Sequence, residues 1–247
     1  MKRPLLLPGR FDSANLDHVV DKASYRREEP KLREALLNAQ FDLAQQARFP
    51  VLIVIGGVEG AGKSETVNLL NEWMDPRHIH THAFPPPSDE ERERPRMWRF
   101  WRHLPRRGRF VLFDRSWYGR VLVERVEGLC AERDWMRAYG EINDFEQAMV
   151  AHGLVVAKFW LAISKQEQLR RLNAREKTSF KRFKLTPDNW RNRKKWEAYE
   201  GAVCDMVDRT STQHAPWTLV EANDKCHARI AVLKTLCAAI EARLDAM

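Results

Sequence analysis

An unbroken apolar strand that leads straight into a glycine-rich loop constrains this chain more than any other feature. Residues 51–55 read VLIVI and residues 57–64 read GVEGAGKS, a full match to the pattern G-x-x-x-x-G-K-[ST]. A stretch suited to a helix, residues 64–74, follows. In this order the glycines let successive backbone N–H groups converge on a phosphate, and the helix N-terminus adds its positive end. The order predicts a phosphate-binding loop rather than a turn without a ligand.

The side chains at the end of this loop have separate expected tasks. Lys63 can reach a phosphoryl group in transfer, and the Ser64 hydroxyl can ligate Mg²⁺. The phosphates themselves would lie against the main chain of the other loop positions, Gly57, Gly60, Ala61 and Gly62.

A carboxylate ends a second apolar strand. Residues 110–114 read FVLFD, and a strand-end acid is the usual Mg²⁺ partner of the loop hydroxyl. Arg115, Arg120 and Arg125 follow within a dozen residues and could clamp phosphates bidentately. Ion pairing with Glu124 or Glu127 on a helix surface is the alternative. The place of Arg115 and Arg120 directly after the strand favours phosphate binding for these two and leaves Arg125 open.

Apolar stretches alternate with helical ones along the whole chain. The expected strands are 51–56, 79–84, 110–114, 154–162 and 217–221. The expected helices are 30–48 with Pro30 at its start, 64–74, 95–104, 131–151, one opened by a capping box at Ser164, one from Pro187, and 224–246. This alternation predicts an α/β fold with a parallel sheet of about five strands and helices on both faces. A chain of 247 residues suits one domain, 1–247, with an N-terminal extension over about 1–29.

Positive charge gathers in two patches. The net charge is +8, yet residues 88–109 carry +4 and residues 175–195 carry +7, which leaves about −3 for the remainder. Such patches indicate a polyanionic partner, although a solvated charged helix end is the alternative for any single residue. In the first patch, Trp98, Trp101 and Leu104 have the spacing of one buried helix face, which we favour over base stacking.

Cysteines and histidines give weaker signals. The four cysteines lack CxxC spacing and indicate reduced thiols in a cytoplasmic protein. No apolar run is long enough for a membrane span, and three consecutive leucines near the start are too few for a signal-peptide core. His78, His80 and His82 alternate along one expected strand, but no clustered cysteine or acid completes a zinc site.

At the strand-end acid the chain resembles a known family. Residues 113–118 read FDRSWY and residues 119–126 read GRVLVERV, which together with the loop resemble the second family of polyphosphate kinases. The resemblance continues through FDLAQQ at 41–46, NEWMDPR at 71–77, PPSDEE at 86–91, FKLTPD at 183–188 and WEAY at 196–199. It implies a P-loop kinase fold, with polyphosphate along the loop and a basic lid and the nucleotide opposite. The sequence after Asp114 is most similar to that of members that phosphorylate AMP to ADP.

The resemblance also assigns roles to residues. The lid, about 175–195, would hold polyphosphate with Arg175, Lys177, Lys181, Arg182 and Lys184. The nucleotide would contact Arg115, Tyr118, Arg120, Glu124 and Arg125. Glu59 stands where the family often has Asp and would hold a second Mg²⁺, while Ser64-Glu65 stands where many members have Gly-Gly or Gly-Thr.

The expected function is therefore Mg²⁺-dependent phosphoryl transfer from inorganic polyphosphate to a nucleotide, with Mn²⁺ as an alternative ion. AMP to ADP is the leading reaction and ADP to ATP a further one. The family also implies a homodimer or homotetramer, with neither nucleic acid nor membrane as a partner. Two alternatives remain: an ATP-dependent nucleoside or nucleotide kinase, and a basic nucleic-acid-binding module with a vestigial loop.

Overall fold

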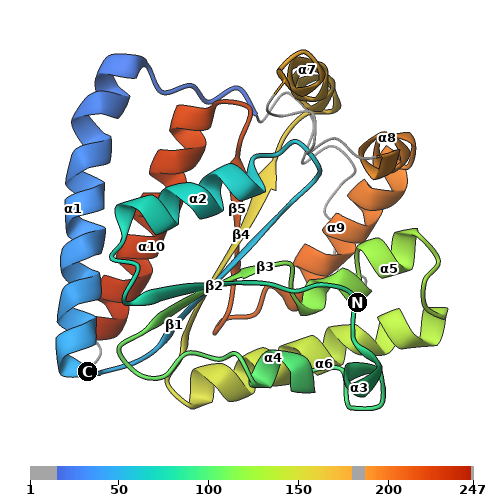
Figure 1. Ribbon diagram of the computed structural model, residues 1–247, viewed down its shortest axis with the longest axis horizontal. Coiled ribbons are helices and arrows are strands. Elements are labelled where there is room, and N and C mark those ends of the chain that lie inside the picture. The colour runs from blue at the N-terminus through green and yellow to red at the C-terminus, as the bar shows by residue number, and fades with distance from the viewer. Residues whose placement is uncertain (1–15, 180–186, 246–247) are drawn as a thin grey trace.

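A five-stranded parallel sheet forms the centre of the molecule (Figure 1). The computed structural model describes residues 16–179 and 187–245. The strands are β1 Val51–Gly57, β2 Ile79–Ala83, β3 Phe110–Asp114, β4 Val155–Ala162 and β5 Trp217–Glu221. They lie in the order β2-β3-β1-β4-β5, and every neighbouring pair is parallel. All five strands therefore end at one edge of the sheet, and the expected α/β fold is confirmed.

The two faces of the sheet have separate apolar cores. Val51, Ile53 and Ile55 of β1 contribute to a core with α1 Lys22–Gln46, α2 Lys63–Trp73 and α10 Lys225–Asp245. Leu52 and Val54 contribute to a core with α6 Glu132–Ala151 and α9 Trp196–Thr210. Figure 1 shows these two groups of helices on opposite sides of the strands. Burial on both faces explains why β1 is apolar at every position rather than at alternate ones.

Shorter elements surround the carboxyl edge of the sheet. They are α3 Asp89–Arg92, α4 Trp98–Trp101, a 3₁₀ turn Trp117–Arg120 and α5 Val123–Val126. Two further helices, α7 Lys165–Glu176 and α8 Pro187–Lys194, lie beyond the carboxyl end of β4 (Figure 1). In α7 the Ser164 hydroxyl accepts from Glu167 N at 3.1 Å, as the capping box predicts. In a full capping box the Ser164 N–H would donate to the Glu167 side chain. Here it donates to Asn223 Oδ1 at 3.0 Å instead.

The first helix begins earlier than the sequence predicts. α1 starts at Lys22, where Asp21 Oδ1 accepts from Ala23 N and Ser24 N, both at 2.9 Å. Pro30 lies inside the helix, so its predicted role as the start is wrong. Contacts with α10 extend upstream of the proline, because Glu28 pairs with Lys234 at 2.6 Å. Residues 22–29 of the expected extension therefore belong to this helix.

The prediction that Trp98, Trp101 and Leu104 form one buried helix face in the first basic patch is also wrong. Trp101 is 46% exposed, whereas Phe100 and Arg99 are buried. α4 is only four residues long, so the i, i+3 spacing does not continue along a helix face. Phe100 packs against Phe84 and Trp117 instead.

No helix in the described ranges combines the length and apolar character needed to cross a membrane.

Candidate phosphoryl-transfer site

The phosphate-binding loop leaves β1 at the carboxyl edge of the sheet and ends in the first turn of α2. Gly60 has φ +85° and Gly62 has φ +107°, conformations that glycine adopts without strain. Lys63 is the first residue of α2, and its Nζ donates to Gly57 O at 2.8 Å and to Val58 O at 3.1 Å. The loop therefore holds the lysine amine against its own main chain.

Glu59 is a carboxylate of the loop on which three nearby cations act. Lys63 Nζ lies 3.5 Å from Glu59 Oε1. The positive charge of Lys63, and to a smaller extent those of Arg175 and Arg115, holds the pKa of Glu59 below its usual value. The site thus brings together a carboxylate and three cations that come from the loop, from the end of β3 and from α7.

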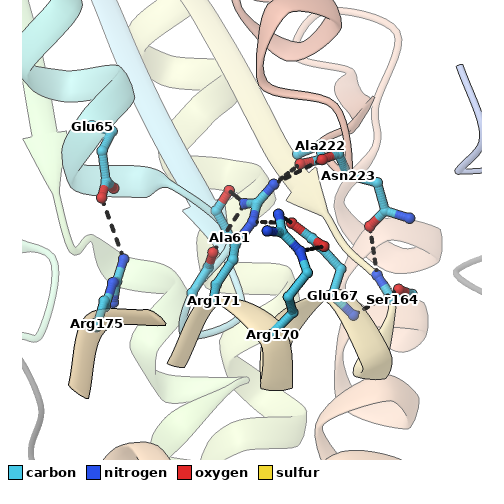
Figure 2. Close-up of polar contacts among 10 residues, drawn as sticks. Ala61, Glu65, Ser164, Glu167, Arg170, Arg171, Arg175, Ala222 and Asn223 are labelled. Atoms are coloured by element: carbon cyan, nitrogen blue, oxygen red, sulfur yellow. Dashed lines mark hydrogen bonds and ion pairs between the residues drawn. The ribbon is translucent and has the colours of Figure 1, made fainter. Parts of the chain in front are cut away.

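A buried arginine braces the loop from behind. Arg171 of α7 donates from Nη1 to Gly60 O and Ala61 O, both at 3.0 Å. Its Nη2 donates to Ala222 O at 2.6 Å and Asn223 O at 3.0 Å, and its Nε to Glu167 Oε1 at 2.6 Å. Figure 2 shows this guanidinium between the loop and the segment after β5. All of its N–H groups are used, so α7 fixes the loop relative to the last strand.

Gln168 and Arg175 add two further contacts between α7 and the loop region. Gln168 Nε2 donates to Glu59 O at 2.9 Å. Arg175 Nη2 lies 3.4 Å from Glu65 Oε1 of α2 (Figure 2). Helix α7 is therefore joined both to the phosphate-binding loop and to the helix α2 that follows it.

The strand-end acid lies beside the loop. Val54 of β1 pairs with Phe113, so Asp114 stands at the same edge, close to where the loop begins. The next residue, Arg115, has φ +64° and is exposed. A non-glycine residue in this region of backbone conformation is strained, and such strain is concentrated at functional sites. The turn directs the chain away from the sheet at the position where a phosphate-binding arginine is expected.

Arg96 and Arg120 share the carboxylate of Glu124. Glu124 Oε1 lies 2.7 Å from Arg96 Nη2, and Glu124 Oε2 lies 3.1 Å from Arg120 Nη1. Burial, together with the nearby charge of Arg120, lowers the pKa of Arg96. The Nε of Arg96 is buried and has no hydrogen-bond partner among the described residues. Two guanidinium groups against one carboxylate give the cluster a net positive charge, which suits an anionic ligand.

The oxygen donors at this edge fit Mg²⁺. They are the Glu59 and Asp114 carboxylates and the Ser64 hydroxyl, and Ser64 is exposed in the first turn of α2. Mg²⁺ prefers oxygen ligands and usually retains water and substrate phosphates rather than filling a cage of protein ligands. No group of three or more His, Cys, Asp or Glu in the described part of the chain could hold a metal by itself.

Comparison with known proteins decides the family. The family model described as polyphosphate kinase 2 (PPK2) matches residues 19–246. The chain belongs to the polyphosphate kinase 2 family. It is 51% identical over 234 residues to a polyphosphate:AMP phosphotransferase of Pseudomonas aeruginosa, a match that covers 95% of this chain and 47% of the relative.

Solved structures give the same family and the same fold. A crystal structure of a polyphosphate kinase 2 from Pseudomonas aeruginosa has a TM-score of 0.91 at 50% identity, covering 96% of this chain and 51% of that one. One from Arthrobacter aurescens has a TM-score of 0.87 at 33% identity, covering 91% and 81%. The chain thus spans about half the length of its Pseudomonas relatives.

Two residues expected to bind nucleotide in this polyphosphate kinase 2 chain point elsewhere. Tyr118 is 3% exposed, and its hydroxyl donates to Glu146 Oε1 at 2.6 Å inside the core. Arg125 pairs with Asp205 at 2.7 Å and donates to Tyr139 Oη at 2.9 Å. Burial of the Tyr118 side chain beneath residues 113–126, here called the signature segment, corrects its expected direct contact with the nucleotide. For Arg125, which keeps a partly exposed side chain, that contact stays a prediction.

The lid residues divide into described and undescribed ones. Arg175 and Lys177 stand in the last turn and at the C-cap of α7. Lys181, Arg182 and Lys184 lie outside the described residues. Past them, α8 returns to α7, where Arg193 Nη1 donates to Lys165 O at 2.6 Å and to Gln168 Oε1 at 3.1 Å.

Sequence reasoning missed the residues that connect segments far apart in the chain. Arg96, Gln168 and Arg171 lie in segments where charged and polar residues are common, and nothing local separates them from solvated ones. Glu127, which the alternative interpretation paired with the arginines after Asp114, pairs with Lys195 at 2.9 Å and Arg191 at 3.2 Å. Only the tertiary fold selects these partners.

Proposed function

We propose that this chain transfers phosphoryl groups from inorganic polyphosphate to a nucleotide, with AMP to ADP as the main reaction and ADP to ATP as a further one. The observation that carries the proposal is a glycine-rich loop in which Lys63 pairs with Glu59 at 3.5 Å, beside Asp114 at the edge of the sheet. The charges of Arg175 and Arg115 act on the same carboxylate. The name of the Pseudomonas aeruginosa relative supports AMP as the acceptor.

The roles follow from charge and position. Lys63 moves from the loop carbonyls to the transferring phosphoryl group and offsets its negative charge. Arg175 and Lys177, with Lys181, Arg182 and Lys184, would bind the polyphosphate chain on the lid side. Arg115 and Arg120 would steady phosphates on either side of the bond that breaks. Phosphoryl transfer depends mainly on such positioning and charge neutralisation.

The metal ion supplies further neutralisation of phosphate charge when it is bound. Ser64, Asp114 and Glu59 would hold Mg²⁺, and Mn²⁺ is an alternative because it also accepts oxygen ligands. The chain's own contribution is to keep these donors at one edge, with Glu59 ionised by its neighbours.

Donor and acceptor profiling tests the proposal. Purified protein with Mg²⁺ is given polyphosphate or ATP as the sole donor, and AMP, GMP, ADP or GDP as acceptor. We expect AMP and polyphosphate to yield ADP. Turnover with ATP but not with polyphosphate would instead indicate an ordinary nucleotide kinase.

Two variants test the assigned roles. Lys63→Ala and Asp114→Asn each remove one charge that is placed before the reaction begins, and we expect turnover to fall about 10²–10³-fold. Circular dichroism establishes that each variant is folded. A folded variant with near-normal turnover would remove the role given to that residue.

A further inference from the structure

A cationic groove runs beside β2, away from the phosphate-binding loop. It has a volume of about 410 Å³ and lies between residues 76–82 and residues 102–111. β2 is one of the two edge strands of the described sheet, in which it pairs with β3 alone. Among the described residues that line the groove, four are arginines, four are histidines and none is acidic.

Three of the four arginines in the groove keep their charge uncancelled. In the described part of the chain, no carboxylate pairs with Arg102, Arg106 or Arg109, whereas the fourth, Arg77, pairs with Asp75. Exposed arginines elsewhere are of both kinds: Arg92, Arg94, Arg137 and Arg170 pair with nearby acids, whereas Arg48, Arg107 and Arg133 pair with no carboxylate among the described residues. The groove is distinguished by three such guanidinium groups lying together with no acidic residue in its described lining, and this marks it as a place for an external anion.

Two of these arginines are held in place by neutral groups. Arg102 lies over the Trp98 ring at 4.6 Å. Arg109 Nη1 donates to Arg77 O at 2.7 Å and contacts His78. These contacts order the guanidinium groups without neutralising them, so their charge stays available to a ligand.

The histidines add hydrogen-bonding rings to the groove. The rings of His80 and His82 lie 4.4 Å apart, and those of His82 and His103 lie 4.1 Å apart. Burial, with the neighbouring His103 and His80, lowers the pKa of His82 to about 4. His82 is therefore uncharged near neutral pH, and the fixed positive charge of the groove comes from its arginines.

The position of the groove connects it to the active edge. Ile79 pairs with Phe110 at the groove end of β2, and Ala83 pairs with Asp114 at the other end. Five residues of strand span roughly 16 Å at about 3.3 Å per residue. A long polyanion can therefore occupy both the catalytic edge and the groove, whereas a short one cannot.

We propose that this groove is a second binding site for long-chain polyphosphate, separate from the loop and the lid. The proposal rests on the proposed function for its ligand. The groove anchors a distal stretch of the polymer and so raises affinity for long chains. It makes no contact with the group being transferred.

A charge-removing variant with a matched control tests the site. The variant is Arg102→Gln with Arg106→Gln, and the control is Arg107→Gln, an exposed neighbour that does not line the groove. Binding of end-labelled long-chain polyphosphate is measured by fluorescence anisotropy across a range of salt concentrations, without nucleotide. Turnover of AMP is measured separately with long-chain polyphosphate and with tripolyphosphate.

The two variants should separate clearly. We expect the double variant to bind the long chain about tenfold more weakly, with a slope of log K against log salt smaller by about 1.4 for two lost contacts. Its turnover with tripolyphosphate, and all properties of Arg107→Gln, should match the parent protein. Equal long-chain binding by parent and double variant would overturn the site. So would preference of the groove for single-stranded nucleic acid over polyphosphate.

The readouts keep the two proposals apart. If the parent protein transfers phosphate from no donor, the proposed function fails while the binding comparison still decides the groove. If the parent protein and both variants all transfer phosphate equally well from tripolyphosphate and from long chains, the proposed function stands and the proposed groove site fails.

Discussion

Single residues show both the strength and the limit of sequence reasoning at this site. Lys63, Ser64, Asp114 and Arg115 lie at one edge because parallel strands end together, a rule that needs no knowledge of side-chain packing. Tyr118 lies only three residues after Arg115, yet it points into the core. Its direction depends on a buried partner, Glu146, from another helix, and no local pattern encodes that partner.

His82 gives a prediction at the same scale. Its folded pKa of about 4 lies below the 6.5 of an unperturbed histidine. Between these values the unfolded chain binds more protons, so the free energy of unfolding should fall as pH drops from about 6.5 towards 4. We expect His82→Leu to reduce this pH dependence, measured by urea unfolding at several pH values. His152→Leu, at an exposed position, is the control; an unchanged slope in His82→Leu would contradict the assignment.

At the scale of elements, α7 is the structural link between the phosphate-binding loop and the segment after β5. Arg171→Met removes a buried donor from four main-chain carbonyls and leaves Glu167 with only its hydrogen bonds from Arg170. Unsatisfied buried groups are costly, so we expect a loss of about 3 kcal/mol in the free energy of unfolding, with lower turnover. Arg171→Lys should restore part of this loss, because an ammonium has only three N–H donors.

Arg170 is the matched control for this prediction. It precedes Arg171 on α7 and also pairs with Glu167, at 2.6 Å, but its side chain is 67% exposed. Arg170→Met should change the free energy of unfolding by less than about 0.5 kcal/mol. Equal effects of the two methionine variants in urea titrations would show that α7 does not brace the loop.

The elements themselves were predictable where periodicity is long and sustained. The five strands and the helices near 64–74, 131–151 and 224–246 follow from apolar pattern alone. The failures have a common cause. Pro30 is tolerated inside α1 because packing on α10 outweighs one missing hydrogen bond, and α4 ends after one turn although its spacing resembles a helix face. In both places tertiary contacts override local preference.

At the scale of the whole molecule, the core beneath the signature segment contains a buried ion pair. Lys158 of β4 and Glu146 of α6 are both fully buried, with Nζ and Oε2 2.6 Å apart. Lys158 also donates to Tyr118 Oη and Thr210 O, both at 2.8 Å. Burial raises the pKa of Glu146 and lowers that of Lys158, so each charge depends on the other. This network ties the sheet to three surrounding segments.

A double-mutant cycle measures what the pair contributes to the stability of the whole fold. Lys158→Met or Glu146→Gln alone leaves one buried charge without its partner, at an expected cost of about 3–5 kcal/mol. The double variant removes both charges, and the new amide oxygen can still accept the indole and phenol hydrogen bonds that the carboxylate accepts. We therefore expect it to be about 2 kcal/mol more stable than the sum of the single effects. The exposed pair Arg137–Glu141 on the same helix α6 is the control, with an expected coupling below about 0.5 kcal/mol. Additive losses at Lys158 and Glu146 in urea unfolding would mean that the two charges are stabilised independently, and that the network does not organise this face of the sheet.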